Sequence, residues 1–312
     1  TTLLPKFNAS LKKGFIAVAA TDYEGSTKFL NEFNACGQAK DWCVTAPAYQ
    51  YVYENDYKLG YTSGTSNATA YATGVAALVK EKYGWMTNEN LKDVILGTAT
   101  DAGATGIDNV YGWGVINKSK AIKGYGQFSW GQTALNVTDG NAYFDNNIFG
   151  TGGFNKTGNG QLVLNGDNTY TGTSNVNGGS VVVNGTNKSS FNVASGAKLV
   201  VGDNTKISTG NVVNNGTLVS ETATDLDING NYTQSKGGKL QKYVGSKLNV
   251  SGVANLNGAL ELTGVVDGYV TATNQNSDVI LTAKGGVVNQ FTSASSKNGL
   301  LLGKVNYTNN DV

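Results

Sequence analysis

Ser66 lies where a serine side chain could act as a nucleophile. Residues 63–78 read Ser-Gly-Thr-Ser-Asn-Ala-Thr-Ala-Tyr-Ala-Thr-Gly-Val-Ala-Ala-Leu, so a glycine turn places Ser66 directly before a helix rich in small residues. Backbone N–H groups at a helix N-terminus stabilise developing negative charge, and the N–H of Ser66 can serve as one oxyanion donor. This arrangement suits acyl transfer. An isolated Gly-Thr-Ser is also a common helix cap, so the tripeptide alone does not establish catalysis.

The proton acceptor for such a serine is missing from the sequence. The 312 residues contain no histidine, and a nucleophilic serine needs a general base, commonly a histidine oriented by a carboxylate. Lysine replaces histidine in some serine hydrolases, and Lys58 and Lys80 are nearby in the sequence. However, no Ser-x-x-Lys pattern marks the helix start, so a Ser–Lys pair is disfavoured. We therefore expect the base to come from polypeptide outside these residues.

The composition excludes several classes of protein. Charged residues make up 14% and hydrophobic residues 39%, which is enough apolar material for a core. The net charge of +1 favours neither nucleic acid nor an anionic membrane surface as a partner. The first residues lack the basic start and apolar stretch of a signal peptide, and we expect the chain to be an internal piece of a longer precursor.

Cys36 and Cys43 are the two cysteines, with six residues between them. In a chain so poor in cysteine, we favour a short-range disulfide, and hence an oxidising compartment. The alternative is a pair of buried free thiols.

Two regions differ in their sequence patterns. Residues 1–125 predict a mixed α/β domain: apolar runs at 14–20 and 42–47 indicate strands, residues 68–82 a helix, Thr87 the cap of a second helix and 117–123 a short third one. The small residues of the first helix predict that it is buried. A boundary is expected between Gly124 and Gln132.

Residues 126–312 carry a repeat of short Val- and Leu-rich runs. The runs begin at glycines 17 to 22 residues apart, namely Gly160, Gly179, Gly196, Gly216, Gly238 and Gly258. A period near ~20 residues with Gly and Asn corners is typical of a stacked solenoid. We predict an all-β, right-handed parallel β-helix, with other all-β folds such as a β-sandwich as the alternative.

The wider segment around Ser66 resembles the active-site serine segment of subtilisin-like serine proteases. Residues 64–74 follow Gly-Thr-Ser-x-Ala-x-x-x-x-x-Gly, residues 15–22 look like a core strand of that family, and residues 111–117 are similar to its late Gly-x-Gly-x-x-Asn segment. Ala70 stands where the family has proline. The resemblance implies that Ser66 is the nucleophile and that this is the C-terminal part of the catalytic domain.

In that family the catalytic Asp and His and the oxyanion-binding Asn precede the serine. The resemblance therefore implies a partner, an N-terminal protease fragment that carries Asp and His. Asp22, Asp41 and Asp56 do not stand in the place of the triad acid and are expected to be solvated loop residues.

Residues 158–185 resemble the passenger-associated repeat of bacterial autotransporters. A subtilisin-like domain followed by this repeat looks like a serine-protease autotransporter. In that family a C-terminal translocator β-barrel exports the passenger through the outer membrane, and the closely spaced pair Cys36 and Cys43 looks like the small loop of that subfamily. The resemblance implies an extracellular or cell-surface serine endopeptidase that acts on proteins or peptides.

Two other functions remain open. A non-catalytic β-helix adhesin or structural passenger, with a relic protease portion, would also explain the absence of histidine. A polysaccharide-degrading β-helix enzyme requires clustered carboxylates, and Asp225 and Asp227 are the close acidic pair of the solenoid, although a solvated strand face explains them better. No Asp-rich loop with a calcium-ligand pattern is visible, so no metal or cofactor is expected.

Overall fold

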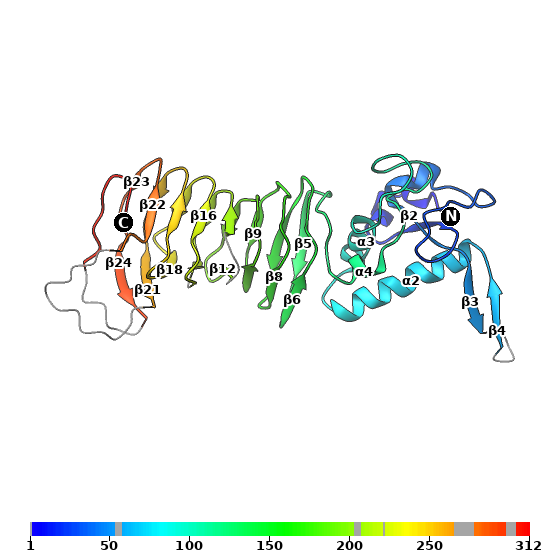
Figure 1. Ribbon diagram of the computed structural model, residues 1–312, viewed down its shortest axis with the longest axis horizontal. Helices are drawn as coiled ribbons and strands as arrows, with labels where there is room; N and C mark the ends of the chain where they lie inside the picture. Colours follow the sequence, from blue (N-terminus) through cyan, green and yellow to red (C-terminus); the bar gives the residue numbers. More distant parts are fainter. Residues whose placement is uncertain (1, 54–57, 203–206, 221, 265–277, 298–303) are drawn as a thin grey trace. The chain divides into compact units, whose positions relative to one another are not determined.

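The chain forms two compact units, Thr1–Gln127 and Phe128–Val312, in the computed structural model. The structure describes residues 2–53, 58–202, 207–220, 222–264, 278–297 and 304–312. The first unit mixes short helices with strands, and the second is built from strands alone among the described residues (Figure 1).

The expected strands and helices of the first unit are present, together with α1, two 3-10 helices and a β-hairpin that the sequence patterns did not predict. In chain order they are α1 (Leu4–Phe7), the 3-10 helix η1 (Ala9–Lys13), β1 (Ala17–Thr21), the 3-10 helix η2 (Gly37–Trp42), β2 (Cys43–Pro47), β3 (Gln50–Tyr53), β4 (Leu59–Thr62), α2 (Thr65–Lys82), α3 (Asn88–Gly97) and α4 (Lys118–Ala121). Thr87 caps α3 as expected: its side chain accepts a hydrogen bond from the backbone N–H of Asn90, and the Asn90 side chain accepts one from the Thr87 backbone.

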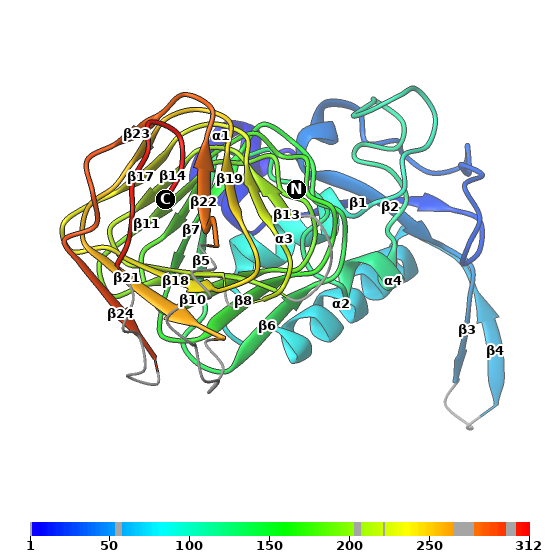
Figure 2. The same cartoon turned by 60° about the vertical axis from the view of Figure 1, so that its left-hand side comes forward.

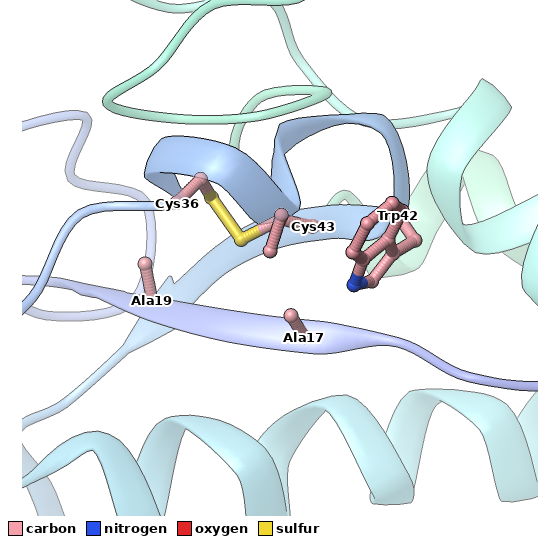
Figure 3. Close-up of a cluster of buried hydrophobic side chains, with 6 residues drawn as sticks. Ala17, Ala19, Cys36, Trp42 and Cys43 are labelled. Carbon is pink, nitrogen blue, oxygen red and sulfur yellow. A yellow bond between two sulfur atoms is a disulfide. The ribbon is translucent and has the colours of Figure 1, made fainter. Parts of the chain in front are cut away.

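A parallel pair of strands, β1 and β2, forms the centre of this unit. Ala17 pairs with Cys43 and Thr21 with Pro47. Every residue of β2 is buried, as is expected of a parallel strand covered on both faces. Ala17 and Ala19 pack beneath Trp42 and the two cysteines, and helix α2 lies on the other side of β1 (Figure 3).

The expectation that α2 is buried is wrong for most of its surface. One stripe is buried, made of Ala68, Ala72, Val75 and Val79 at helical spacing. Gly74, Ala77 and Leu78 are exposed. The physical reason is that the two strands cover one side of the helix only, and the small residues on its other side meet no partner among the described residues.

The second unit is a parallel β-helix, as predicted. One sheet contains, in order along the stack, β24 (Ser293–Ser296), β21 (Ala259–Thr263), β18 (Lys239–Tyr243), β15 (Thr217–Ser220), β12 (Lys198–Val201), β10 (Ser180–Val183), β8 (Gln161–Leu164) and β6 (Asn141–Phe144). Five of these strands begin directly after a glycine of the repeat and β12 begins two residues after Gly196, because each glycine turns the chain into the next strand.

Two further sheets complete the coils. The second contains β23 (Val287–Val288), β20 (Ala254–Asn255), β17 (Tyr232–Gln234), β14 (Val212–Asn214), β11 (Phe191–Val193), β9 (Ser174–Val176), β7 (Gly153–Thr157) and β5 (Gln132–Asn136). The third contains β13 (Ile207–Thr209), β16 (Leu226–Ile228), β19 (Leu248–Val250) and β22 (Leu281–Ala283). All the neighbouring strands pair in parallel (Figure 2).

The interior of the coils is an aliphatic stack. Residues in matching register on successive strands point inward and are at most 1% exposed: Leu162, Val181, Leu199, Leu218, Leu240 and Leu260. A single coil would leave these apolar side chains exposed to water. The stacking of neighbouring coils buries them.

Two lysines interrupt this interior, which the repeat pattern did not predict. Lys156 and Lys242 are both 0% exposed. The Nζ of Lys156 donates to the carbonyl oxygens of Gly158 (2.9 Å), Gly178 (2.8 Å) and Gly160, and the Nζ of Lys242 donates to the Oγ of Ser246. Burial lowers the pKa of each ammonium group to about 8. The aliphatic stems fill the core while the charged ends reach polar atoms at the corners.

No helix among the described residues is both long and apolar enough to span a bilayer.

Candidate active site

Ser66 lies in the first turn of α2, which begins at Thr65 directly after Gly64. The backbone of Gly64 has φ 151° and ψ 161°, a region that is almost closed to residues with a Cβ atom. This turn brings the chain out of strand β4 and into the helix within two residues. The side chain of Ser66 is exposed to solvent.

The first turn of α2 leaves the N–H of Ser66 itself unpaired within the described residues. The N–H groups of Asn67 and Ala68 both donate to the carbonyl oxygen of Gly64, at 3.1 and 3.2 Å. Within the described part of the chain, neither the N–H nor the Oγ of Ser66 has a hydrogen-bond partner. Such unpaired N–H groups at a helix start are the donors that bind an oxyanion. The local geometry is therefore compatible with a serine that attacks a carbonyl carbon and holds the resulting negative charge.

Neither nearby lysine is placed to deprotonate Ser66. Lys80 lies near the other end of α2, about 21 Å away along the helix axis at ~1.5 Å per residue. Its Nζ donates to the carbonyl oxygens of Gly84 (2.7 Å) and Met86 (2.6 Å). Lys58 precedes strand β4 at the far end of the β3–β4 hairpin and is exposed. The structure thus agrees with the sequence in disfavouring a Ser–Lys pair.

The acidic residues near Ser66 in the sequence have other surroundings. Asp22 is half-buried and its carboxylate lies 3.8 Å from the Nζ of Lys28. Asp41 is exposed, and Asp56 lies outside the described residues. The expectation of solvated loop residues is thus met only in part: Asp41 is exposed but lies in the 3-10 helix η2, and Asp22 lies in a loop but is half-buried.

A group of polar side chains at the carboxyl ends of β1 and β2 was missed by sequence reasoning. The carboxylate of Glu24 accepts hydrogen bonds from the Nζ of Lys118 and the hydroxyl of Tyr71, both at 2.7 Å. These two hydrogen bonds lower the pKa of Glu24, and burial together with the Glu24 contact raises the pKa of Tyr71. The three residues line a hollow of about 260 Å³ with Pro47 and Ile116. Because they are up to 94 positions apart in the sequence, no local pattern could reveal them.

Cys36 and Cys43 form the predicted disulfide, with their Cα atoms 5.8 Å apart (Figure 3). It joins the residue before η2 to the first residue of β2 and is buried. The disulfide thereby joins the two ends of η2 and holds this helix against β2.

The acidic pair of the solenoid is occupied by structural contacts. The carboxylate of Asp225 accepts the backbone N–H of Lys247 at 2.6 Å, and that of Asp227 accepts the side-chain amide of Asn249 at 2.9 Å. Both contacts join one coil to the next, so they stabilise the stack. This gives no support to a polysaccharide-degrading site.

Comparisons with known protein families agree with the two units. Residues 6–114 match the model of the subtilase family, and residues 154–183 match the passenger-associated-transport-repeat. The first match contains Ser66, and the second covers strands β8 and β9 and ends with β10.

Curated relatives match between about half and nearly all of the chain. The Neisserial autotransporter lipoprotein NalP of Neisseria meningitidis serogroup B is 34% identical over 96% of this chain and 30% of its own length. Serotype-specific antigen 1 of Mannheimia haemolytica is 31% identical over 90% of this chain and 28% of its own length. An extracellular serine protease of Serratia marcescens is 30% identical over 53% of this chain and 21% of its own length. The chain thus spans less than a third of the length of these relatives.

Proposed function

We propose that this chain is part of a secreted or surface-displayed serine endopeptidase. The premise is that it joins a segment matching the subtilase family to the passenger-associated repeat, as in a subtilisin-like autotransporter. Ser66 is the nucleophile. The observation that carries this proposal is the exposed Ser66 in the first turn of α2, with its own N–H unpaired within the described residues, inside the segment that matches the subtilase family.

In this mechanism the Oγ of Ser66 attacks the carbonyl carbon of the scissile peptide bond. The hydroxyl proton passes to a histidine base and then to the leaving amine, and water later hydrolyses the acyl-enzyme. The N–H of Ser66 donates to the oxyanion of the tetrahedral intermediate. Since the chain has no histidine, the catalytic His and Asp and the oxyanion-binding Asn come from a preceding segment of the protein.

The first unit offers two surfaces to that segment. Residues 113–116 cover the outer edge of β2, with the N–H of Trp113 donating to Cys43 and a parallel bridge between Thr45 and Val115. The other edge of β1 is bridged near its carboxyl end, where Thr21 pairs with Phe29 and the N–H of Leu30 donates to the carbonyl oxygen of Ala20 at 3.4 Å, and no other strand is hydrogen-bonded to β1 within the described residues. Parallel sheets normally contain more than two strands and are covered on both faces. Further strands from the preceding segment, paired with this edge of β1, would therefore complete the sheet.

The second surface is the exposed side of α2. Ala70, Thr73, Gly74 and Ala77 are exposed there, and such small side chains let another element approach the helix backbone closely. We expect the segment that carries Asp and His to pack on this side as well as beside β1. This also accounts for a helix rich in small residues that is buried along one stripe only.

The solenoid is the passenger stalk in this proposal. Its similarity to autotransporters implies export through the outer membrane by a C-terminal translocator and a location outside the cell or on its surface. The disulfide between Cys36 and Cys43 fits an oxidising compartment. Proteins or peptides are the substrates.

A fluorophosphonate probe on the full-length precursor tests the assignment of Ser66. The unsubstituted protein and a Ser63→Ala control should be labelled, and Ser66→Ala should not be. Ser66→Ala should also lower kcat on an unfolded protein such as β-casein by about 10⁶-fold, the loss seen when a subtilisin loses its nucleophile. Ser63 is a matched control because it is exposed and lies three residues away.

Failure of this test would favour the alternative, a non-catalytic adhesin or structural passenger with a relic protease portion. A folded precursor that takes no label and cleaves no peptide library would establish that outcome. Labelling retained in Ser66→Ala would instead show that another residue is the nucleophile.

A further inference from the structure

The hairpin that precedes Ser66 has one aromatic face. Strands β3 and β4 pair antiparallel, with Tyr51 opposite Tyr61 and Tyr53 opposite Leu59. Side chains alternate between the two faces of a strand, so these four lie on one face. The opposite face carries only small, aliphatic or polar residues: Gln50, Val52, Gly60 and Thr62.

This aromatic face is exposed to solvent. Tyr51 is 72% exposed, Tyr53 76%, Leu59 62% and Tyr61 60%. The ring of Tyr61 stacks on that of Tyr49 at a centroid distance of 5.5 Å and contacts Tyr51 at 5.4 Å. The face is therefore a preformed row of aromatic rings.

Such a face is unusual on a two-stranded hairpin. An isolated hairpin is only marginally stable in water, and its apolar face normally packs on a core. Here the hairpin projects from the first unit, with its strands pointing away from α2 and the central sheet (Figures 1 and 2). Contiguous exposed apolar side chains of this kind mark binding surfaces, and tyrosine is enriched in such surfaces because its ring is large and rigid.

The base of the hairpin is tied to the turn that presents Ser66. The side-chain amide of Gln50, at the start of β3, donates to the carbonyl oxygen of Asn67 at 3.0 Å. The side-chain amide of Asn67 donates to the carbonyl oxygen of Ala48 at 3.1 Å. Strand β4 ends at Thr62, four residues before Ser66. The aromatic face thus continues directly from the candidate active site.

We propose that the aromatic face, made of Tyr51, Tyr53, Leu59 and Tyr61, binds an extended segment of the polypeptide substrate that flanks the scissile bond. This inference rests on the proposed function and specifies its substrates. The preferred segment is unfolded and carries aromatic or branched aliphatic side chains, which pack on the tyrosine rings. Low charge is expected of it, because Lys58 is the one charged residue among positions 50–53 and 58–62.

The continuity with Ser66 favours a substrate over other occupants. A polypeptide with its scissile bond at Ser66 passes the turn at residues 63–65, which directly follows the end of the hairpin at Thr62. A second copy of the chain and the preceding segment of the same protein are the other occupants, and the test below distinguishes them.

The test compares two substrates of the full-length protein. One is β-casein, an unfolded protein with apolar segments. The other is a tetrapeptide p-nitroanilide, which has no residues beyond the cleaved bond. In Tyr51→Ser/Tyr61→Ser, the ratio of kcat/KM for β-casein to that for the tetrapeptide should fall about tenfold, as expected for two aromatic anchors.

Two further variants sharpen this measurement. Tyr53→Ser should lower the same ratio several-fold while keeping the stacked pair of Tyr49 and Tyr61 intact. Val52→Ser on the opposite face is the matched control and should leave the ratio unchanged, since it alters the same strand without touching the rings.

Each contrary outcome is distinct. An unchanged ratio in both tyrosine variants, with β-casein still cleaved, would overturn this inference and leave the proposed function intact. Equal losses on both substrates with a lower melting temperature would show that the face packs on the protein's own preceding segment. A change of oligomeric state would identify a second copy as the occupant. If the unsubstituted protein cleaved neither substrate, the proposed function would fail and this inference with it.

Discussion

Replacing Leu218 with alanine should strongly destabilise the β-helix. Leu218 is 0% exposed and lies in register between Leu199 on one coil and Leu240 on the next. Burial of a leucine between two fixed neighbours leaves a cavity when it is truncated, because strands held from both sides cannot collapse into the space. Leu→Ala substitutions in such cores cost about 2 to 5 kcal/mol. Because Leu218 is fully buried and flanked in register on both sides, we take about 3.5 kcal/mol, the middle of this range, as the expected loss.

Urea unfolding followed by circular dichroism measures this loss. With a slope of about 2.5 kcal/mol per molar urea for a unit of this size, the midpoint should fall by about 1.4 M. Val219→Ala is the matched control. Val219 is the next residue of β15, points outward and is partly exposed, so its truncation should cost less than about 1 kcal/mol.

The comparison of these neighbours can refute the proposed packing. If Val219→Ala lowered the midpoint as much as Leu218→Ala, the inward and outward assignment of β15 would be wrong. If neither variant changed it, the aliphatic stack would not be the main source of cohesion between coils.

Two further predictions concern the disulfide and a buried lysine. Cys36→Ala/Cys43→Ala should lower the free energy of unfolding of the first unit by about 2.5 kcal/mol, which is the chain-entropy value for a closed loop of about eight residues. The same urea titration measures this loss, with a reduced sample of the unsubstituted protein for comparison. An unchanged urea midpoint would contradict the prediction. Lys156 has a folded-state pKa of about 8, below its ordinary value, so the folded state binds fewer protons than the unfolded state between about pH 8 and 10.5 and stability should rise with pH in that window. This rise in the free energy of unfolding is at most about 3 kcal/mol, because three carbonyl acceptors favour the charged form of Lys156. The rise should be smaller in Lys156→Met. Equal dependence of stability on pH in the two proteins would refute the prediction.

Helices α2, α3 and α4 and the solenoid strands could be predicted because their signals are local. The glycines that precede β8, β10 and β12 recur at the length of one coil, and alternating apolar residues follow each of them. Helix α3 has its cap at Thr87, which satisfies N–H groups within the same turn. Such signals depend on residues a few positions apart, so they can be recognised without knowledge of the fold.

The residue order also identified Ser66 as the candidate nucleophile and Cys36 with Cys43 as a disulfide. The first inference needed the glycine turn before a helix and the resemblance to subtilisin-like proteases. It did not reveal Asn67 and Gln50, whose side chains fix the turn, because their partners depend on how the hairpin returns to the helix.

Only the tertiary structure decided which faces are covered and which are open. The sequence determined that α2 is a helix rich in small residues, but its burial depends on how many strands pack against it. The pairing of Tyr51 with Tyr61 and the inward position of Lys156 likewise depend on strand register. Gly112 is needed because a Cβ atom there would collide with the carbonyl oxygen of Cys43, far away in the sequence. Local propensity sets the elements, whereas contacts between distant segments set their exposed surfaces, and those surfaces carry the proposed chemistry and binding.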